Sequence, residues 1–415
     1  MSNNKSLISL VFAGMLTSLP MLVFAETVFE EVRVVYDSGE QQDAISSAAV
    51  DVYGNMYITG KHINILGGYY TAKYDSYGRE EWRRVHSPGG GPGVSKMAID
   101  KNGNTYVALG SHLGKVLKYD ADGNENILAN PGIVGFGCCS GKVGLMLDRN
   151  ENNLYSWAAH TIQKINLGNG NTEWIQKLHA ANYLIRDVAE DDAGNIYVVG
   201  HSLNSITDIV IKKFDSSGNV VWSQFWAEEG VQNESVYGLE LDSNNNVYIL
   251  AQVLSYEASC LYCIATSVVN FSEDGYFINS VVMNGINEHV AGAIKMEDDK
   301  LYVVMRERSS HTMITQKRNL DLSLVWSVAH PIGNRVPNNL DVDGIGNVVV
   351  GFQGNNSKMN TVKFDENGTE LWTIEGEGSN PVFVKFGATS DVYAAGSSAL
   401  DAFMYRYDAT PLICQ

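Results

Sequence analysis

The sequence lacks the short motifs that define the common enzyme classes. It has no His-Glu-x-x-His motif, no Gly-x-Ser-x-Gly motif and no phosphate-cradling Gly loop. Helical periodicity is also absent throughout, which excludes a helical repeat protein. The sequence therefore assigns no catalytic residue, predicts no metal ligands and identifies no cofactor.

The chain is poor in basic residues, with 29 Lys and Arg against 47 Asp and Glu and a net charge of −18. A field of that sign repels phosphate backbones and anionic lipid. We therefore expect no nucleic-acid binding and no binding to a membrane surface. Cationic partners and divalent metals stay open, although solubility alone explains such a charge.

The first 25 residues have the pattern of a secretion signal. Lys5 is followed by an almost wholly apolar run, and Val23-Phe24-Ala25 places small residues at the cleavage positions. The apolar length alone would also allow an uncleaved membrane anchor, but Pro20 and the acidic flank after Ala25 favour cleavage. We expect an exported protein, periplasmic or extracellular, with no membrane insertion after signal cleavage.

Cysteine is scarce, and its number, five, is odd. Exported proteins usually pair their cysteines, so Cys260 and Cys263, three positions apart, predict a local disulfide. Cys138 and Cys139 are adjacent, and a vicinal disulfide there would stiffen a Gly-rich linker. Cys414 has no obvious partner.

One pattern is abundant. Short runs of β-branched and aromatic residues alternate with Gly-containing polar turns, as in residues 191–200 and 209–222. The unit recurs every 42 to 54 residues and is aligned by Tyr57, Tyr106, Tyr155, Tyr197, Tyr248, Tyr302, Val349 and Tyr393. Four strands per unit at that period are typical of a propeller blade.

The turns of the different units contain similar residues at equivalent positions. The first turn of a unit begins with Asp and ends in Gly-Asn, as in Asp51 to Asn55, so Asp is expected to accept local backbone hydrogen bonds. A Trp often follows the second turn and is expected to cover the flank of the blade. Asp242-x-Asn244-x-Asn246 faintly resembles a calcium loop, but its position indicates a turn of this kind.

The two ends of the repeat array complement each other. The last unit stops after its third strand, Phe403–Tyr407, whereas Phe29–Val35 resembles a lone outer strand. Pairing them would complete one blade and close the ring. The fold class predicted is all-β: residues 26–415 form a single eight-bladed β-propeller of four-stranded antiparallel blades.

The repeats resemble the bacterial β-propeller repeat (SBBP) family. Gly103-Asn104-Thr105-Tyr106-Val107 and Lys213-Phe214-Asp215 to Trp222 carry the resemblance, which covers residues 46–408. The resemblance implies export and a propeller, and it implies no reaction.

A weaker resemblance is to quinoprotein-type eight-bladed propellers, through an Asp-x-x-Gly-x-x-x-Trp repeat. It occurs at Asp75, Asp215 and Asp365, although those docking repeats normally have Thr before the Gly. Quinoprotein alcohol dehydrogenases also use an adjacent Cys–Cys disulfide over their quinone, which would match Cys138-Cys139. No motif matching their calcium ligands or catalytic Asp is found in this sequence.

The meander gives the ring two different faces. Both tight turns of each unit emerge on one, which we call the tight-turn face. The second-to-third strand and blade-to-blade connections emerge on the other, the loop face, where binding residues usually lie. None of the nine histidines occupies a tight turn, and the candidate ligand-binding residues of the loop face are His62, His112, His160, His201, His311, Cys138 and Cys139.

These histidines allow two interpretations. In one, turn chemistry alone excludes His from the tight-turn face. In the other, the loop face binds a ligand or metal through neutral imidazole. A single shared ion is disfavoured because the second-strand loops of neighbouring blades lie far apart.

The predicted function is an exported, non-catalytic propeller, expected to be monomeric, that binds a protein or glycan through its loop face. The alternative is a quinone-dependent dehydrogenase of the periplasm.

Overall fold

The computed structural model describes residues 29–37, 43–62, 68–86, 95–109, 116–129, 143–178, 183–202, 208–227, 231–257, 260–283, 289–337, 339–398 and 401–408. Within these ranges the regular secondary structure consists of β-strands, as the β-branched and aromatic runs predict. Across the same ranges, no helix is long and apolar enough to cross a membrane. The predicted signal at residues 1–25 lies outside the described residues.

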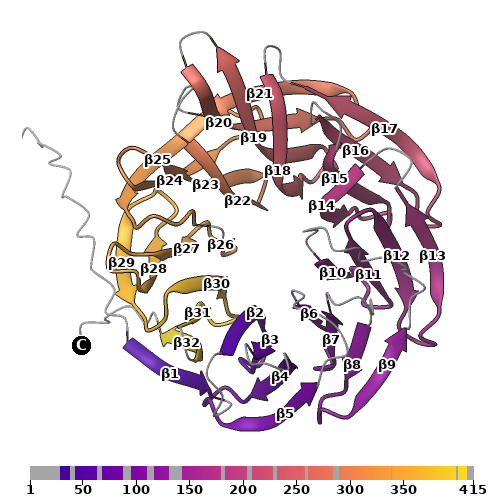
Figure 1. Cartoon of the computed structure of the whole chain (residues 1–415), viewed down its shortest axis with the longest axis vertical. Helices are drawn as coiled ribbons and strands as arrows, with labels where there is room; N and C mark the ends of the chain where they lie inside the picture. The colour runs from indigo at the N-terminus through magenta and orange to yellow at the C-terminus, as the bar shows by residue number, and fades with distance from the viewer. Residues whose placement is uncertain are drawn as a thin grey trace, which may run out of the picture.

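The strands form eight four-stranded antiparallel sheets arranged as the blades of a ring (Figure 1). The first four blades, each given from the ring axis outward, are β2 (Asp43–Val50), β3 (Met56–His62), β4 (Gly68–Tyr74), β5 (Glu80–His86); β6 (Ser95–Ile99), β7 (Thr105–Leu109), β8 (Val116–Tyr119), β9 (Glu125–Ala129); β10 (Val143–Leu147), β11 (Asn153–Ala158), β12 (Thr161–Asn166), β13 (Thr172–Lys177); and β14 (Tyr183–Glu190), β15 (Ile196–Ser202), β16 (Ile209–Phe214), β17 (Val220–Trp226). The other four are β18 (Val231–Leu241), β19 (Val247–Glu257), β20 (Cys260–Phe271), β21 (Phe277–Met283); β22 (His289–Glu297), β23 (Lys300–Glu307), β24 (Thr312–Arg318), β25 (Leu324–Pro331); β26 (Asn339–Val342), β27 (Val348–Gln353), β28 (Met359–Phe364), β29 (Glu370–Glu375); and β30 (Asn380–Phe386), β31 (Val392–Ser397), β32 (Ala402–Asp408), β1 (Phe29–Tyr36).

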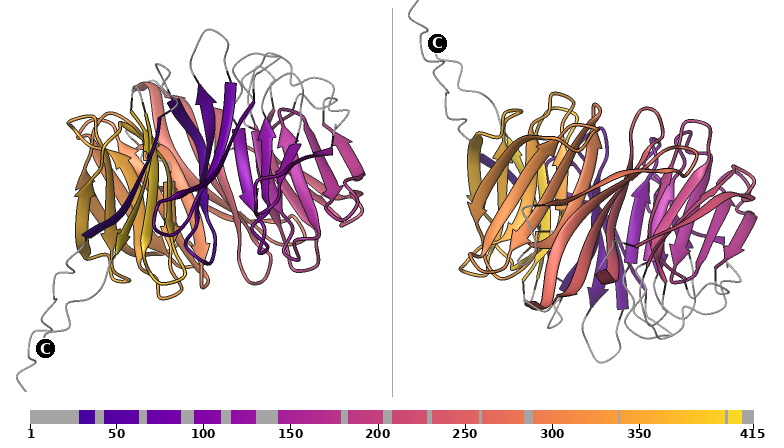
Figure 2. Two further views of the ribbon diagram at one scale, coloured as in Figure 1. Left: turned by 90° about the horizontal axis from the view of Figure 1, so that it is seen from below. Right: turned by 90° about the horizontal axis from the view of Figure 1, so that it is seen from above.

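The N-terminal strand closes the ring. β1 pairs antiparallel with β32, in the register that places Val35 opposite Phe403 and Glu30 opposite Tyr407. The split blade predicted from the two ends of the sequence is thus confirmed. Figure 2 shows the blades from the side, with the strands crossing the ring between its two faces.

The core is divided among the blade interfaces. Eight clusters of buried side chains each combine residues of two neighbouring blades, one cluster at every interface around the ring. Each blade therefore buries both faces of its sheet against its neighbours, which explains the nearly continuous burial of second strands such as β15. No blade has an independent core.

The first turns are held by their Asp, as predicted. Asp51 Oδ1 accepts hydrogen bonds from the backbone N–H groups of Tyr53 and Asn55, both at 2.9 Å, and Oδ2 accepts one from Asn55 Nδ2 at 2.8 Å. The buried Tyr57 hydroxyl also donates to Asp51 Oδ2, at 3.1 Å. The Tyr that aligns the repeats therefore clamps the turn as well as filling the core. The turns that begin at Asp100, Asp191 and Asp242 repeat this arrangement.

The outer-strand Trp residues join consecutive blades. Trp174 Nε1 donates to Ser216 O at 3.2 Å, and the indole lies against Gly218 in the second turn of the next blade. Trp82, Trp222 and Trp326 repeat this contact with the next blade. The expected covering of the blade flank by Trp is confirmed.

The hairpin of the fifth blade is longer than those of the other blades. β19 continues to Glu257 and β20 begins at Cys260, so Cys260 and Cys263 lie within a strand. Apolar and β-branched residues such as Val253 and Ile264 extend the pairing of these two strands.

Candidate functional site

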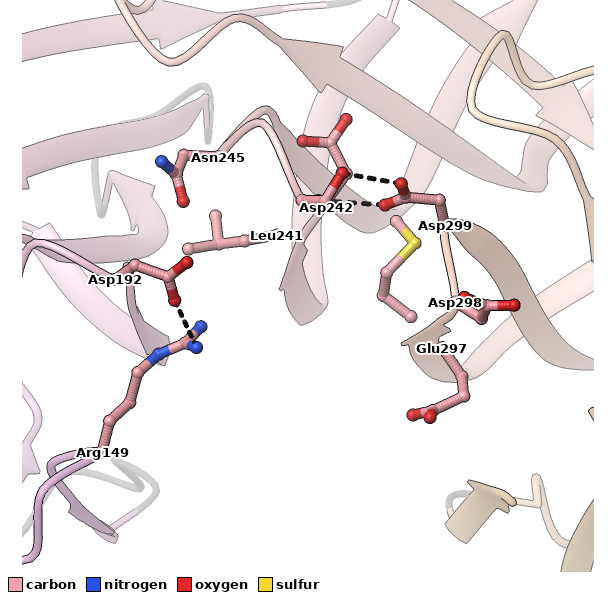
Figure 3. Close-up of a pocket in the computed structure, with 10 residues that line it drawn as sticks. Arg149, Asp192, Leu241, Asp242, Asn245, Glu297, Asp298 and Asp299 are labelled. Atoms are coloured by element: carbon pink, nitrogen blue, oxygen red, sulfur yellow. Dashed lines mark hydrogen bonds and ion pairs between the residues drawn. The ribbon is translucent and has the colours of Figure 1, made fainter. Parts of the chain in front are cut away.

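A cavity of about 470 Å³ opens on the tight-turn face. First turns of four consecutive blades meet there, those between β10 and β11, β14 and β15, β18 and β19, and β22 and β23 (Figure 3). The lining residues are Arg149, Asp192, Leu241, Asp242, Ser243, Asn245, Met296, Glu297, Asp298 and Asp299. Each first turn connects the innermost strand of a blade to the second strand of that blade, so the cavity lies near the ring axis.

The cavity is strongly acidic. Five of its ten lining side chains are carboxylates, and one, Arg149, is basic. Arg149 Nη1 lies 2.5 Å from Asp192 Oδ1, so its charge is directed to one side of the cavity. The excess of negative charge therefore belongs to the side formed by the β18–β19 and β22–β23 turns, as Figure 3 shows.

Two of the carboxylates are occupied in holding turns. Asp242 accepts hydrogen bonds from the backbone N–H groups of Asn244 and Asn246 at 2.9 and 2.8 Å. Asp299 accepts bonds from Ser243 N at 3.0 Å and Ser243 Oγ at 2.6 Å, which lower the pKa of its carboxyl. Asp299 stays ionised and ties the two turns together. The turn reading of the Asp242 motif is confirmed.

The remaining pair, Glu297 and Asp298, is available. Neither side chain makes a hydrogen bond or ion pair within the part of the chain that the structure describes. Asp298 is exposed and has a left-handed backbone with φ of 48°, which a short polar side chain tolerates well. These two carboxylates carry negative charge into the cavity and hold none of its turns in place.

Charge alternates along the innermost strands beside this cavity. Glu240, Lys295, Asp341 and Lys385 each lie on the innermost strand of consecutive blades, near its tight-turn end. Lys295 Nζ lies 4.0 Å from Glu240 Oε1. Burial raises the pKa of Glu240 to about 7, with Lys295 opposing and Asp187 reinforcing the shift. Lys295 and Glu240 thus pair with each other beside the acidic cavity.

On the loop face, His62 lies at the interface between the N-terminal strand β1 and the first complete blade. Its Nδ1 lies 2.6 Å from Asp43 Oδ1, and its Nε2 lies 3.4 Å from the hydroxyl of Tyr36 at the end of β1. Tyr36 also stacks on Tyr70, with ring centroids 3.8 Å apart. His62 is 6% exposed, so it is a buried residue of the sheet and is not free to meet a ligand.

His201 is also buried, in β15. Arg186 lies beside the ring, with its Nε 3.5 Å from His201 Nδ1. Burial, with the charge of Arg186, lowers the pKa of His201 to about 4. The imidazole is therefore neutral at neutral pH.

The two other described candidates lie in loop-face turns. His160, between β11 and β12, hydrogen-bonds the carbonyl oxygen of Tyr183 in the next blade. His311, between β23 and β24, is exposed and lies 2.9 Å from Arg306 Nη2. These four candidate histidines belong to four different blades, and within the described residues no contact joins any two of them. Throughout the described ranges, no group of three or more His, Cys, Asp or Glu residues could hold a metal ion.

Part of the predicted loop-face set cannot be placed. His112, Cys138 and Cys139 lie outside the described residues, as does Cys414. Cys260 and Cys263 fall in β20, but their side chains also lie outside what the structure describes. Their predicted binding role and disulfide remain predictions.

The sequence did not predict the acidic cavity, because its residues lie in first turns. The side chains of a regular first turn form hydrogen bonds with the backbone of that turn. The signal lay in the irregular turns. Glu297-Asp298-Asp299 replaces the usual Asp-x-x-Gly-Asn pattern, and Arg149 follows the Asp of another first turn. In an irregular turn, side chains that would hold the backbone of a regular turn are left available for other contacts.

The fold defines the class of protein as an eight-bladed β-propeller. No family model matches the chain, and no curated protein matches its sequence. The Dos1 propeller is similar in structure, with a TM-score of 0.59 and 11% identity over 91% of this chain and 95% of that one. U3-55K is also similar, with a TM-score of 0.51 and 10% identity over 91% of this chain and all of the other. Likeness at such identity shows the fold alone, so the propeller is confirmed and SBBP membership stays a prediction.

Proposed function

We propose that the protein is an exported, non-catalytic propeller that binds a basic segment of a protein ligand at the acidic cavity of its tight-turn face. The observation that carries the proposal is the pair Glu297 and Asp298, two uncommitted carboxylates at the edge of a cavity near the ring axis. The proposal differs from the sequence-based expectation in the face that it assigns to binding.

Charge complementarity selects the ligand class. Cavity carboxylates attract Lys and Arg, and the net charge of −18 steers a basic segment toward the protein from a distance. A neutral glycan would gain nothing from this field. Binding should weaken as ionic strength rises, because the carboxylates are partly exposed.

The alternative of a quinone-dependent dehydrogenase rests on the Trp repeats and on Cys138-Cys139. In the structure these Trp side chains join consecutive blades through hydrogen bonds, and this role requires no cofactor. A bound quinone absorbs in the near ultraviolet and visible, so one absorption spectrum of protein made in the periplasm separates the two functions.

The test compares two triple variants with the same change of charge. The cavity variant combines Asp192→Asn, Glu297→Gln and Asp298→Asn, all in the cavity. The control variant combines Asp122→Asn, Asp274→Asn and Glu366→Gln, which are exposed second-turn residues of the same face outside the cavity.

The ligand probe is a fluorescent Lys-Gly repeat peptide, with a Gln-Gly repeat as its neutral counterpart, and binding is followed by anisotropy. The cavity variant loses the two uncommitted carboxylates, at roughly 0.5 kcal/mol for each charge pair, and Asp192→Asn leaves Arg149 without its partner to repel the peptide, so this variant should bind about tenfold more weakly. The control variant should bind like the unmodified protein. Equal losses in both variants, or binding of the neutral peptide, would show that the cavity is not the site.

A further inference from the structure

The outer rim of the ring differs in charge from blade to blade. Five outermost strands, β1, β5, β9, β13 and β29, each contain at least one Asp, Glu, Lys or Arg. The outermost strands of three consecutive blades, β17, β21 and β25, contain none. In a chain with 47 acidic residues, three adjacent uncharged edges form a distinct surface, which we call the uncharged rim.

Apolar side chains are exposed along the uncharged rim. β17 starts with Val220 and Val221, β21 with Phe277 and Ile278, and β25 with Leu324 and Val325, all of them about half exposed. In β5 the same two positions are Glu80 and Glu81. Charged residues on an edge strand are a common protection against pairing with another chain, and the uncharged rim lacks that protection.

The middle strand of the rim is an edge of its sheet. β21 pairs only with β20 among the described strands, so its outer row of N–H and C=O groups faces away from the blade. Such a row is a template for a further antiparallel strand. Figure 1 shows β21 on the outside of the ring between β17 and β25.

We propose that the uncharged rim is the surface through which two copies of this chain associate, with β21 pairing antiparallel to β21 of the second copy about a twofold axis. In such an isologous contact the same patch lies on both sides, so any net charge in it would face its own sign. An acidic edge would attract a basic partner and repel a second copy. An uncharged edge suits a second copy of an acidic chain.

The central strand alone is smaller than a standard interface. A standard interface takes about 20–30 residues from each partner. β21 has 7 residues, and β17 and β25 beside it have 7 and 8. The flanking strands are therefore needed to complete a stable contact around the central strand pair. The sequence alone led us to expect a monomer, and the rim is the reason to revise that expectation.

The test is sedimentation velocity of the purified protein and of charge variants at the centre of the rim. Ser280 is the middle residue of β21, so Ser280→Lys and Ser280→Glu each place like charges opposite one another across the twofold axis. Either should weaken association at least tenfold, since juxtaposed like charges cost several kcal/mol. An equimolar mixture of the two variants should associate again, because the facing charges are then opposite.

Val85→Lys is the control, because it places a new charge on an exposed residue of the outer strand β5, outside the uncharged rim. It should associate like the unmodified protein, and thermal melts should show that all three variants are folded. An unmodified protein that stays monomeric up to about 100 μM, where a micromolar dissociation constant gives mostly dimer, would overturn the proposal. Dimers that survive both Ser280 substitutions, or a mixture that stays monomeric, would overturn it too.

Discussion

A glycine in the second turn of a blade gives room to the indole of the blade before it. A Cβ built at Gly218 would lie 2.8 Å from the ring of Trp174, and Gly218 has a φ of +85°. Gly194, in a first turn, has a similar φ of +78° but open space, with its nearest neighbour 3.7 Å away. The two positions separate the backbone requirement for Gly from the packing requirement.

We expect Gly218→Ala to lower the free energy of unfolding more than Gly194→Ala does. Both substitutions place Ala in a left-handed conformation at a cost of about 1 kcal/mol. Gly218→Ala should cost roughly 1–3 kcal/mol more because the indole must shift. Urea unfolding of the two variants measures the difference. Equal losses would mean that the Trp contact contributes nothing to joining the blades.

A second prediction concerns His201, whose pKa falls from 6.5 to about 4 in the folded protein. The unfolded chain binds the proton first as the pH falls, so stability is lost between about pH 6.5 and about pH 4. The loss should approach roughly 3 kcal/mol, at 1.36 kcal/mol per pKa unit. His201→Gln removes the titrating group and should flatten this part of the curve of unfolding free energy against pH. Parallel curves for the two proteins would contradict the buried, neutral imidazole.

At the scale of the strand, β1 is the element on which the ring depends. Its Val32 and Val34 lie against Gly78 in the first complete blade, where other blades place a Trp. Tyr36 at its end joins the buried His62 and Asp43 of that blade. β1 therefore completes one sheet and also seals the interface to the next.

Deleting residues 26–37 should leave β32 as an unprotected edge and cause aggregation or a large fall in melting temperature. Adding a synthetic peptide of residues 29–36 in excess should recover part of the melting temperature, because it can occupy the vacant position. A scrambled peptide of the same composition is the control. A deletion variant that melts like the complete protein would show that the split blade does not hold the ring.

The strands and turns were predictable because their causes are local. An Asp followed by Gly-Asn specifies its turn within five residues, and alternating apolar runs specify strands. The Tyr57 hydroxyl bond to Asp51 was not predictable, because it needs the strand to return over the turn. The burial of His62 and His201 was missed for a related reason. His62 is the last residue of a second strand and His201 the last but one, and the sequence does not show that the sheet continues that far.

At the scale of the whole molecule, eight similar blades form a ring whose surfaces are not equivalent. Four consecutive blades meet in the acidic cavity, and three consecutive blades carry the uncharged rim. These asymmetries come from departures within the repeat, such as Glu297-Asp298-Asp299 in place of a regular turn. Repetition explains the fold, whereas the irregular positions distinguish one region of the ring from another.

The location of the ligand is the central claim, and carbodiimide cross-linking tests it most directly. The reagent joins a lysine amine to a carboxylate without a spacer, and mass spectrometry of the protein coupled to the Lys-Gly repeat peptide identifies the carboxylates used. We predict that cross-links concentrate on Glu297 and Asp298 and that salt present during the coupling suppresses them. Cross-links spread over exposed carboxylates such as Asp122 and Glu366 to the same degree, or concentrated on the loop face, would contradict the account.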